Sequence, residues 1–242
     1  MIEPQRIAVV TGANRGIGFE TCRQLARAGI KPILTSRDGL LGKAAADKLQ
    51  SEGLEVAYQP LDVTRPESIR RLADFLENGF GRADVLINNA GIFPEHTGRD
   101  GAPTPSVLEV EDAVLEQHLA VNAYGPLHLA QTLVPLMRRH GYGRIVNLTS
   151  GYAQFSRMGR GFPAYRFSKA GLNVITRLLA AETDGENILV NAVDPGWVRT
   201  RMGGAQASAS PAEAAGRVVE LAQLGDDAPT GRLFRHGEVV DW

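Results

Sequence analysis

The fold is decided by residues 6–18, which read R-I-A-V-V-T-G-A-N-R-G-I-G. A short apolar run comes first, then the glycines Gly12, Gly16 and Gly18, and then an amphipathic stretch at 17–28. Glycine lets the backbone turn tightly and approach a phosphate closely, because no Cβ stands in the way. The free N–H groups at the start of the following helix favour negative charge. The stretch therefore predicts a strand, a turn and a helix that together bind a dinucleotide.

The alternation of apolar runs and amphipathic stretches continues along the chain. Further β-branched-rich runs, typical of strands buried on both faces of a parallel sheet, lie at 31–35, 54–58, 83–87, 143–148 and 187–193, with a candidate edge strand at 233–235. Helix-like stretches lie at 39–52, 66–78, 107–122, 126–140, 166–182 and 211–223. This pattern predicts an α/β fold, with right-handed βαβ units in a doubly wound parallel sheet. We expect a single Rossmann-type domain over 1–242, with about seven strands in the order 3-2-1-4-5-6-7 and helices on both faces.

Composition limits the class of protein. The 242 residues carry a formal net charge of −1, so no broad electrostatic case exists for nucleic acid or an anionic membrane as a partner. Cys22 is the only cysteine, which excludes an intrachain disulfide. No 18-residue apolar run or signal-peptide core is visible, so we expect a cytoplasmic protein. The histidines show no metal-ligand spacing, and no metal site is expected.

Three long loops each follow a predicted strand on its carboxyl side, the edge where open α/β sheets bind ligands. They lie at 92–106, 152–163 and 201–210, and we interpret them as substrate loops. The aromatic and methionine side chains of the loop 152–163 would either line the substrate site or cover the core.

The end of the second strand bears on which dinucleotide binds. An NAD site usually places an acid there for the ribose 2′-hydroxyl, but this chain has the neutral Ser36 followed by Arg37. Arg15 lies within the glycine-rich turn, and two guanidinium groups would suit a 2′-phosphate. The sequence therefore favours NADP, although Asp38 leaves an NAD-type ribose contact open.

The segment Y-R-F-S-K (165–169) places Tyr165 and Lys169 one helical turn apart on one face. Such a pair arises by chance in many surface helices. Here it occurs together with N-N-A-G (88–91), Asn122 and Ser150, and in that company the chain resembles the short-chain dehydrogenase/reductase family over nearly its full length.

Further stretches resemble the NADPH-dependent carbonyl reductases within that family. They are T-G-A-N-R-G-I-G-F-E (11–20), L-T-S-R-D (34–38), L-D-V-T (61–64) and P-G-W-V-R-T (195–200).

The resemblance implies roles for four catalytic positions. Tyr165 would be the proton donor, and Lys169 its partner and a ligand of the nicotinamide ribose. Ser150 would orient the carbonyl, although Thr149 and Ser156 compete with it as the substrate hydroxyl. Asn122 would hold a water that links Lys169 to solvent.

The resemblance also implies a set of cofactor contacts. The phosphates would lie against the turn, Asp62 and Val63 would flank the adenine, the segment after the fourth strand would lie over the centre of the cofactor, and the P-G-W-V-R-T loop would hold the nicotinamide amide. The residues are Gly12, Asn14, Arg15, Gly16, Ile17, Gly18, Arg37, Asp62, Val63, Asn89, Ala90, Gly91, Tyr165, Lys169, Pro195, Gly196, Val198 and Thr200.

The chemistry explains why a lysine should accompany the tyrosine. Reduction of a carbonyl develops negative charge on oxygen, and a free tyrosine, with a pKa of about 10, exchanges protons poorly at neutral pH. A nearby ammonium should lower that pKa.

We therefore expect NADPH-dependent reduction of a small-molecule ketone, aldehyde or quinone. The alternatives are an NAD-dependent secondary-alcohol dehydrogenase and a non-catalytic dinucleotide sensor on the same fold. The gap between Ser150 and Tyr165 is slightly longer than is common in the family, but it lacks the large insertion of some monomeric animal carbonyl reductases. A homo-oligomer, a dimer or a tetramer, therefore remains open.

Overall fold

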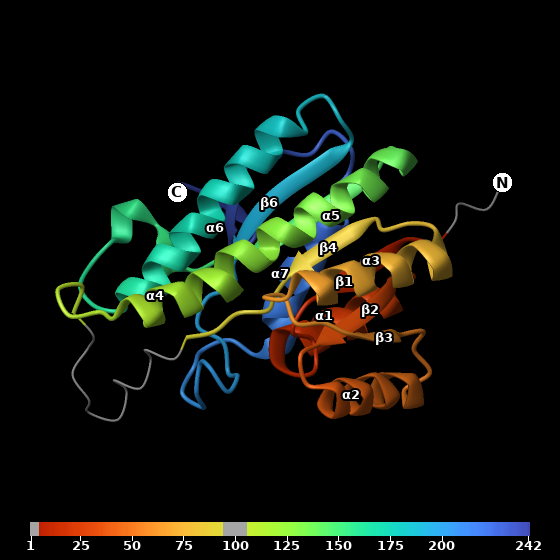
Figure 1. Cartoon of the computed structure of the whole chain (residues 1–242), viewed down its shortest axis with the longest axis horizontal. Coiled ribbons are helices and arrows are strands. Elements are labelled where there is room, and N and C mark those ends of the chain that lie inside the picture. Colours follow the sequence, from red (N-terminus) through yellow and green to blue (C-terminus); the bar gives the residue numbers. More distant parts are fainter. Residues whose placement is uncertain (1–4, 94–105) are drawn as a thin grey trace.

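One sheet runs through the middle of the molecule. The structure is a computed structural model, and it describes residues 5–93 and 106–242. In these residues the strands are β1 (Ile7–Val10), β2 (Lys31–Ser36), β3 (Ala57–Pro60), β4 (Val85–Asn88), β5 (Gly143–Leu148), β6 (Ile188–Asp194), β7 (Leu233–Arg235) and β8 (Glu238–Val240). Their order is β3-β2-β1-β4-β5-β6-β7-β8, and the first seven are parallel. The predicted fold class and strand order are confirmed (Figure 1).

The eighth strand was not predicted. It pairs antiparallel with β7 across the two-residue turn His236-Gly237, where both residues have positive φ angles of 53° and 84°. Such a turn matches the twist of an antiparallel hairpin. Elsewhere the element bounds shift by a few residues. The third strand occupies 57–60 rather than 54–58, and the helix expected at 166–182 already begins at Pro163.

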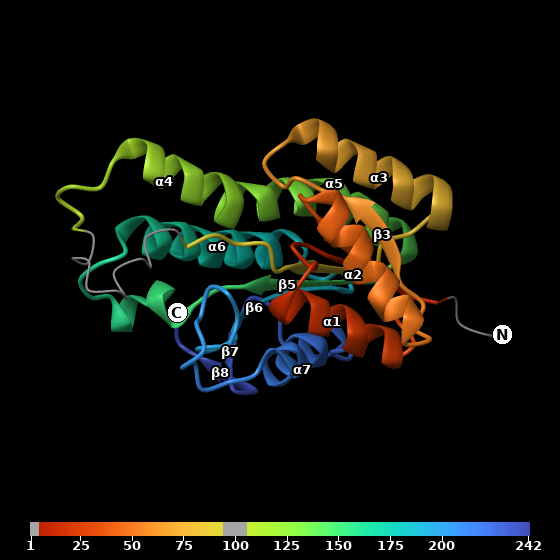
Figure 2. The same cartoon turned by 90° about the horizontal axis from the view of Figure 1, so that it is seen from below.

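Helices cover both faces of the sheet. They are α1 (Gly16–Arg27), α2 (Gly39–Ser51), α3 (Pro66–Phe80), α4 (Asp112–Leu119), α5 (Gly125–His140), α6 (Pro163–Glu182) and α7 (Pro211–Ala222). Figure 2 shows α3, α4, α5 and α6 on one side of the sheet, with α1 and α7 on the other.

The core is divided by the sheet into two apolar clusters. Leu72 of α3 and Leu133 of α5 pack on one face, and Leu25 of α1 and Val218 of α7 pack on the other. Because side chains alternate along a strand, each buried strand serves both clusters; Val9 points to the first and its neighbour Val10 to the second. This explains why the strand sequences are apolar almost without interruption.

The helix that leads into the site contains a π-helical turn, η2 (Ala120–Tyr124), which joins α4 to α5. There the N–H of Gly125 donates to the carbonyl of Ala120, five residues back. The sequence suggested two separate helices, 107–122 and 126–140. Instead, α4 begins at Asp112 and the chain stays helical through Pro126, which occupies the start of α5. Wide turns of this kind often occur at functional sites.

Candidate active site

The predicted site residues lie after the carboxyl ends of the central strands. The glycine-rich turn follows β1, residues 89–91 follow β4, Ser150 follows β5 and the 195–200 loop follows β6. Since these strands are parallel neighbours, their carboxyl ends open on one edge of the sheet.

Tyr165 and Lys169 lie one turn apart near the start of α6, and both are buried. The side chains of Ser150 and Tyr165 share a hydrogen bond. The Lys169 ammonium donates to the carbonyl oxygen of Leu148, over 2.6 Å, at the last residue of β5. The structure therefore brings three of the four predicted catalytic residues together.

Burial dominates the protonation of this pair. It raises the pKa of Tyr165 to about 12, helped by the charges of Asp194 and Tyr152 and opposed by the hydrogen bond with Ser150. Burial also lowers the pKa of Lys169 to about 8. The expected lowering of the tyrosine pKa by Lys169 is not among the causes of this shift, of which the cost of burying a phenolate is the largest.

Asn122 lies on the π-helical turn and is fully buried. Its amide exchanges two hydrogen bonds with Ile92: Oδ1 accepts from the N–H at 2.9 Å and Nδ2 donates to the carbonyl at 3.0 Å. Nδ2 also donates to Ser168 Oγ at 3.0 Å. A Cβ built on Gly91 would lie 3.4 Å from Asn122 Oδ1 and 3.5 Å from Lys169 Nζ. Asn122 therefore adjoins Lys169 and ties α6 to the loop after β4.

The hydroxyls that competed with Ser150 point elsewhere. Thr149 Oγ1 donates to Asn173 Oδ1 at 2.6 Å and is buried behind the strand end. Ser156 is exposed in the short helical turn η4 (Phe155–Arg157).

The glycine-rich turn packs tightly against the segment after β4. A Cβ on Gly12 would lie 2.9 Å from Ala90 Cα, and one on Gly18 would lie 2.5 Å from Asn89 Nδ2. That amide nitrogen donates to the carbonyls of Thr11 and Gly12 at 2.7 and 3.1 Å. Asn89 is thus a brace for the turn, and two of the glycines are required by protein packing as well as by any phosphate.

The amino end of α1 is electropositive. Arg15 at the N-cap position makes no side-chain capping bond, and the first turn of the helix has no acidic residue. Burial first, and then the charge of Arg201, lower the pKa of Arg15, so these two cations lie near one another. Gly16 faces Thr200, with 3.3 Å between its built Cβ and Cγ2. Asn14 and Ile17 lie in this same segment, which fits an anionic cofactor.

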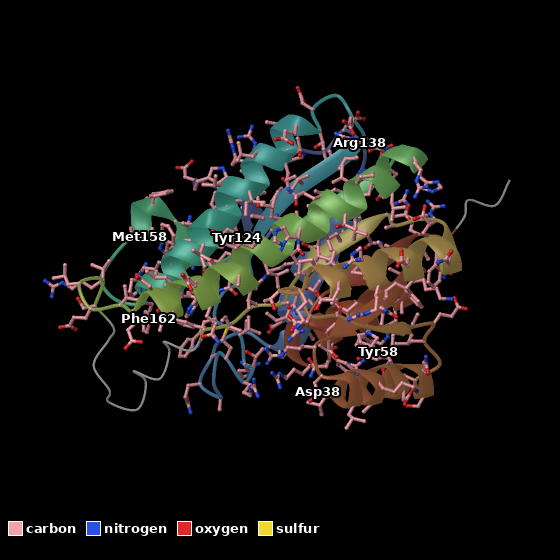
Figure 3. All side chains as sticks on the ribbon, in the orientation of Figure 1. Asp38, Tyr58, Tyr124, Arg138, Met158 and Phe162 are labelled. Atoms are coloured by element: carbon pink, nitrogen blue, oxygen red, sulfur yellow. The ribbon has the colours of Figure 1, made fainter. Side chains whose placement is uncertain are left out.

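The adenosine end of the predicted site shows what Asp38 does. Its carboxylate accepts from the N–H of Leu41 at 3.0 Å and caps α2. Arg37 beside it is exposed. Despite partial burial, hydrogen bonds from Thr64 and then the charges of Arg37 and Arg65 lower the pKa of Asp62, which places Arg37 near Asp62. Val63 next to it is buried. Figure 3 labels Asp38 at the start of α2.

The loop after β6 is held by its own backbone and by neighbours. Gly196 N–H donates to Asp194 Oδ1 at 3.0 Å, and Pro195 accepts from Arg217 at 3.1 Å. Val198 forms a β-bridge with Ala209. These contacts close the segment that contains Thr200 into a compact loop whose tip faces the glycine-rich turn.

One neighbour of the site was missed by sequence reasoning. Arg201 lies within a predicted loop, but nothing in its spacing showed that it approaches Arg15. Phe93 belongs to a predicted substrate loop, as a residue that would either line the site or cover the core. It stacks on the ring of Tyr165, with 4.0 Å between ring centroids and 23° between planes. The remainder of the loop 92–106, from residue 94 to 105, lies outside the described residues.

Within 5–93 and 106–242, no group of histidine, cysteine, aspartate or glutamate side chains is arranged to hold a metal ion. No helix in those ranges has the length and apolar character needed to span a membrane.

Comparisons with known proteins agree with this geometry. Residues 6–210 match the family model for short chain dehydrogenases. The chain is 36% identical to carbonyl reductase (NADPH) 3 from Rattus norvegicus over 98% of both chains. It is 33% identical to (+)-neomenthol dehydrogenase from Arabidopsis thaliana over 99% of both.

Solved structures give the same result. Salutaridine reductase from Papaver somniferum superposes with a TM-score of 0.81 at 30% identity, covering 95% of this chain and 99% of that one. A metagenomic short-chain oxidoreductase in complex with NADP gives a TM-score of 0.79 at 28% identity, covering 95% of this chain and 96% of its own. The chain belongs to the short-chain dehydrogenase/reductase family of oxidoreductases, and its relatives include NADPH carbonyl reductases.

Proposed function

We propose that the protein reduces the carbonyl group of a small ketone, aldehyde or quinone with NADPH, and that Tyr165 is the proton donor. The observation that carries this proposal is the Ser150–Tyr165 hydroxyl pair, with Lys169 one helical turn away, at the sheet edge where the glycine-rich turn also lies. A pure binding module has no need of two hydroxyls and a buried amine at that point.

A nicotinamide held by the loop 195–200 would supply the hydride that adds to the carbonyl carbon. The hydroxyls of Ser150 and Tyr165 hydrogen-bond the carbonyl oxygen and hold the carbon in line for that transfer. As negative charge develops on the oxygen, Tyr165 O–H donates its proton, so that one hydride and one proton give the alcohol.

Lys169 and Asn122 support the proton donor. Lys169 is anchored on the Leu148 carbonyl and keeps its remaining N–H groups for the ribose hydroxyls and for the phenolate left after proton transfer. Asn122, which adjoins Lys169, would hold the water that returns the proton to this lysine.

The preference for NADP is supported by Asp38 and Arg37. Asp38 serves as the N-cap of α2, an ordinary use for a residue at that position, whereas Arg37 remains exposed near Asp62. A guanidinium in that place suits a 2′-phosphate better than a ribose hydroxyl. The NADP-bound structural neighbour and the carbonyl reductase relatives support the same choice.

The first experiment is the initial rate of NADPH oxidation, with NADH alongside, against quinones, diketones, aromatic aldehydes and ketones. We expect turnover with NADPH well above that with NADH. Turnover chiefly with NADH would instead favour the NAD-linked alcohol dehydrogenase.

The control is Tyr165→Phe, which removes one oxygen. We expect it to abolish turnover while NADPH still binds, as measured by cofactor fluorescence. Normal turnover by this variant would refute the mechanism. Tight NADPH binding by the unmodified chain with no turnover across the panel would revive the sensor.

A further inference from the structure

Three aromatic rings cluster with the ring of Tyr165, the proposed proton donor. Phe93, from the loop after β4, stacks on Tyr165 and meets Phe162 edge-on with 5.0 Å between centroids. Tyr152 lies 5.7 Å from Phe162 and 6.3 Å edge-on from Tyr165. Such offset and edge-to-face arrangements are the favourable geometries for aromatic rings. We call Phe93, Tyr152 and Phe162 the aromatic wall; Figure 3 labels Phe162 near the start of α6.

The wall is partly open to a ligand. Phe93 and Tyr165 are buried, whereas Tyr152 remains 40% exposed and Phe162 is half-buried. Tyr152 also lies close to the reacting hydroxyls, because its N–H donates to Ser150 Oγ at 3.2 Å. The exposed ring surface therefore adjoins the point where the carbonyl oxygen would be held.

Arg166 fixes this wall to α6. Its guanidinium donates to the carbonyls of Gly161 and Tyr152 at 2.8 and 3.1 Å, and to that of Arg160 at 3.3 Å. It also lies over the Tyr152 ring, 4.6 Å from the centroid. Arg166 is buried and directly follows Tyr165 in sequence, so one helical turn bears both the proton donor and the side chain that holds the wall. A ring that is already held loses little freedom when a ligand stacks on it.

We propose that the aromatic wall, chiefly Tyr152, selects carbonyl compounds that carry an aromatic ring on the carbonyl carbon over saturated compounds of the same size. This inference rests on the proposed function of the site. An aromatic ring stacked on Tyr152 is stabilised by the electrostatic attraction between the two rings as well as by the burial of apolar surface. A saturated ring of similar area is stabilised by the burial alone.

The test compares acetophenone with cyclohexyl methyl ketone, which differ only in the unsaturation of the ring. The readout is the ratio of their kcat/KM values with NADPH, in the unmodified protein and in Tyr152→Leu. Conjugation alone makes the aryl ketone less reactive, so the selection is measured by how the ratio of kcat/KM for acetophenone to that for cyclohexyl methyl ketone changes on mutation. We expect this ratio to be roughly 2- to 10-fold lower in Tyr152→Leu.

Two further variants make the comparison specific. Tyr152→Phe keeps the ring and should retain the ratio. Phe155→Leu removes a ring from the same loop that is 67% exposed and, among the described residues, makes no ring contact with the wall; it should leave the ratio unchanged. Thermal unfolding establishes that each variant is folded.

A binding measurement separates this proposal from the proposed function. Each ketone is titrated into the protein saturated with NADP⁺, which cannot reduce it, and its Kd is measured by ligand-observed NMR. Tighter binding of acetophenone than of the saturated ketone, lost in Tyr152→Leu, would support selection by the aromatic wall. This holds even if the protein reduces neither ketone, a result that would contradict only the proposed reduction. Equal Kd values for the two ketones, or equal losses for both in Tyr152→Leu, would overturn the aromatic selection while NADPH turnover could still stand.

Discussion

The ammonium of Lys169 donates a hydrogen bond to the carbonyl oxygen of Leu148, and this contact joins α6 to the last residue of β5. Burial lowers the lysine pKa from 10.5 to about 8, so its charged form is a burden on the folded state. In the unfolded chain the same amine holds its proton until about pH 10.4. The native state therefore releases this proton first as pH rises.

The first prediction concerns stability and pH. Below about pH 8 the buried charge costs on the order of 3 kcal/mol, a cost that disappears as pH rises from 8 through 10.5. Relative to Lys169→Met, the unmodified protein should gain unfolding free energy over this range. Urea unfolding of both proteins at pH 7 to 10 measures the difference between their unfolding free energies. The titration of Tyr165 and Cys22 cancels in this difference because both proteins contain these residues. A constant difference across these pH values would show that the lysine pKa is not lowered.

A second prediction separates the two possible uses of Asp38. Because its carboxylate caps α2, Asp38→Ala should lower the unfolding free energy by about 1 kcal/mol, while Asp38→Asn should keep most of it. Both variants should keep the preference for NADPH. A large loss of NADH affinity in Asp38→Asn, measured by fluorescence titration, would assign the residue to the ribose instead.

A third prediction concerns Arg37. Replacement by Asp should weaken NADPH binding far more than NADH binding, because an exposed guanidinium near Asp62 would be exchanged for a carboxylate that repels the 2′-phosphate. Arg70→Asp, on the exposed side of α3, makes the same charge change and should alter neither affinity. Equal losses for the two cofactors in Arg37→Asp would remove Arg37 from the 2′-phosphate site.

A fourth prediction follows from the brace on the glycine-rich turn. Gly18→Ala would place a Cβ 2.5 Å from Asn89 Nδ2 and 2.9 Å from Ala13 Cα, so Asn89 must release the carbonyls it holds. We expect lower stability together with weaker NADPH binding. Gly79→Ala in α3, where a Cβ has nothing within 4 Å, should stabilise the protein by up to about 1 kcal/mol. Gly18→Ala with unchanged Tm and cofactor affinity would contradict the packing argument.

Much of the fold could be predicted because the strands are buried on both faces. Where apolar runs alternate with amphipathic stretches, an apolar run such as 143–148 is interpreted as a buried strand of a parallel sheet. The order of the strands then follows from right-handed crossovers. The strand at 233–235 was predicted, but β8 and its pairing with β7 were missed because β8 has only three residues and the turn before it uses His236 rather than the usual asparagine. The π-helical turn at 120–124 was missed because Gly125-Pro126 looks like a helix break. In the structure the helix continues through Pro126, and the irregular turn directly before it is the π-helical one.

The site could be predicted only as far as local spacing reaches. Tyr165 and Lys169 are close because a helix makes them so, and the strand ends place Ser150 beside them. Phe93 lies 72 positions from Tyr165, and its stacking depends on the path of a loop that no spacing rule describes. The protonation of the pair also depends on burial, which a sequence motif does not quantify.

The five residues Y-R-F-S-K are constrained unequally. Arg166 holds three carbonyls of the loop 152–163, and Ser168 accepts from Asn122 while donating to the Tyr165 carbonyl at 2.9 Å. Phe167 instead is 60% exposed. The motif is usually written with three variable positions between tyrosine and lysine. In this protein only the central position, Phe167, lacks such structural constraints. A saturation scan of the segment should tolerate many amino acids at 167 and few at the four positions around it.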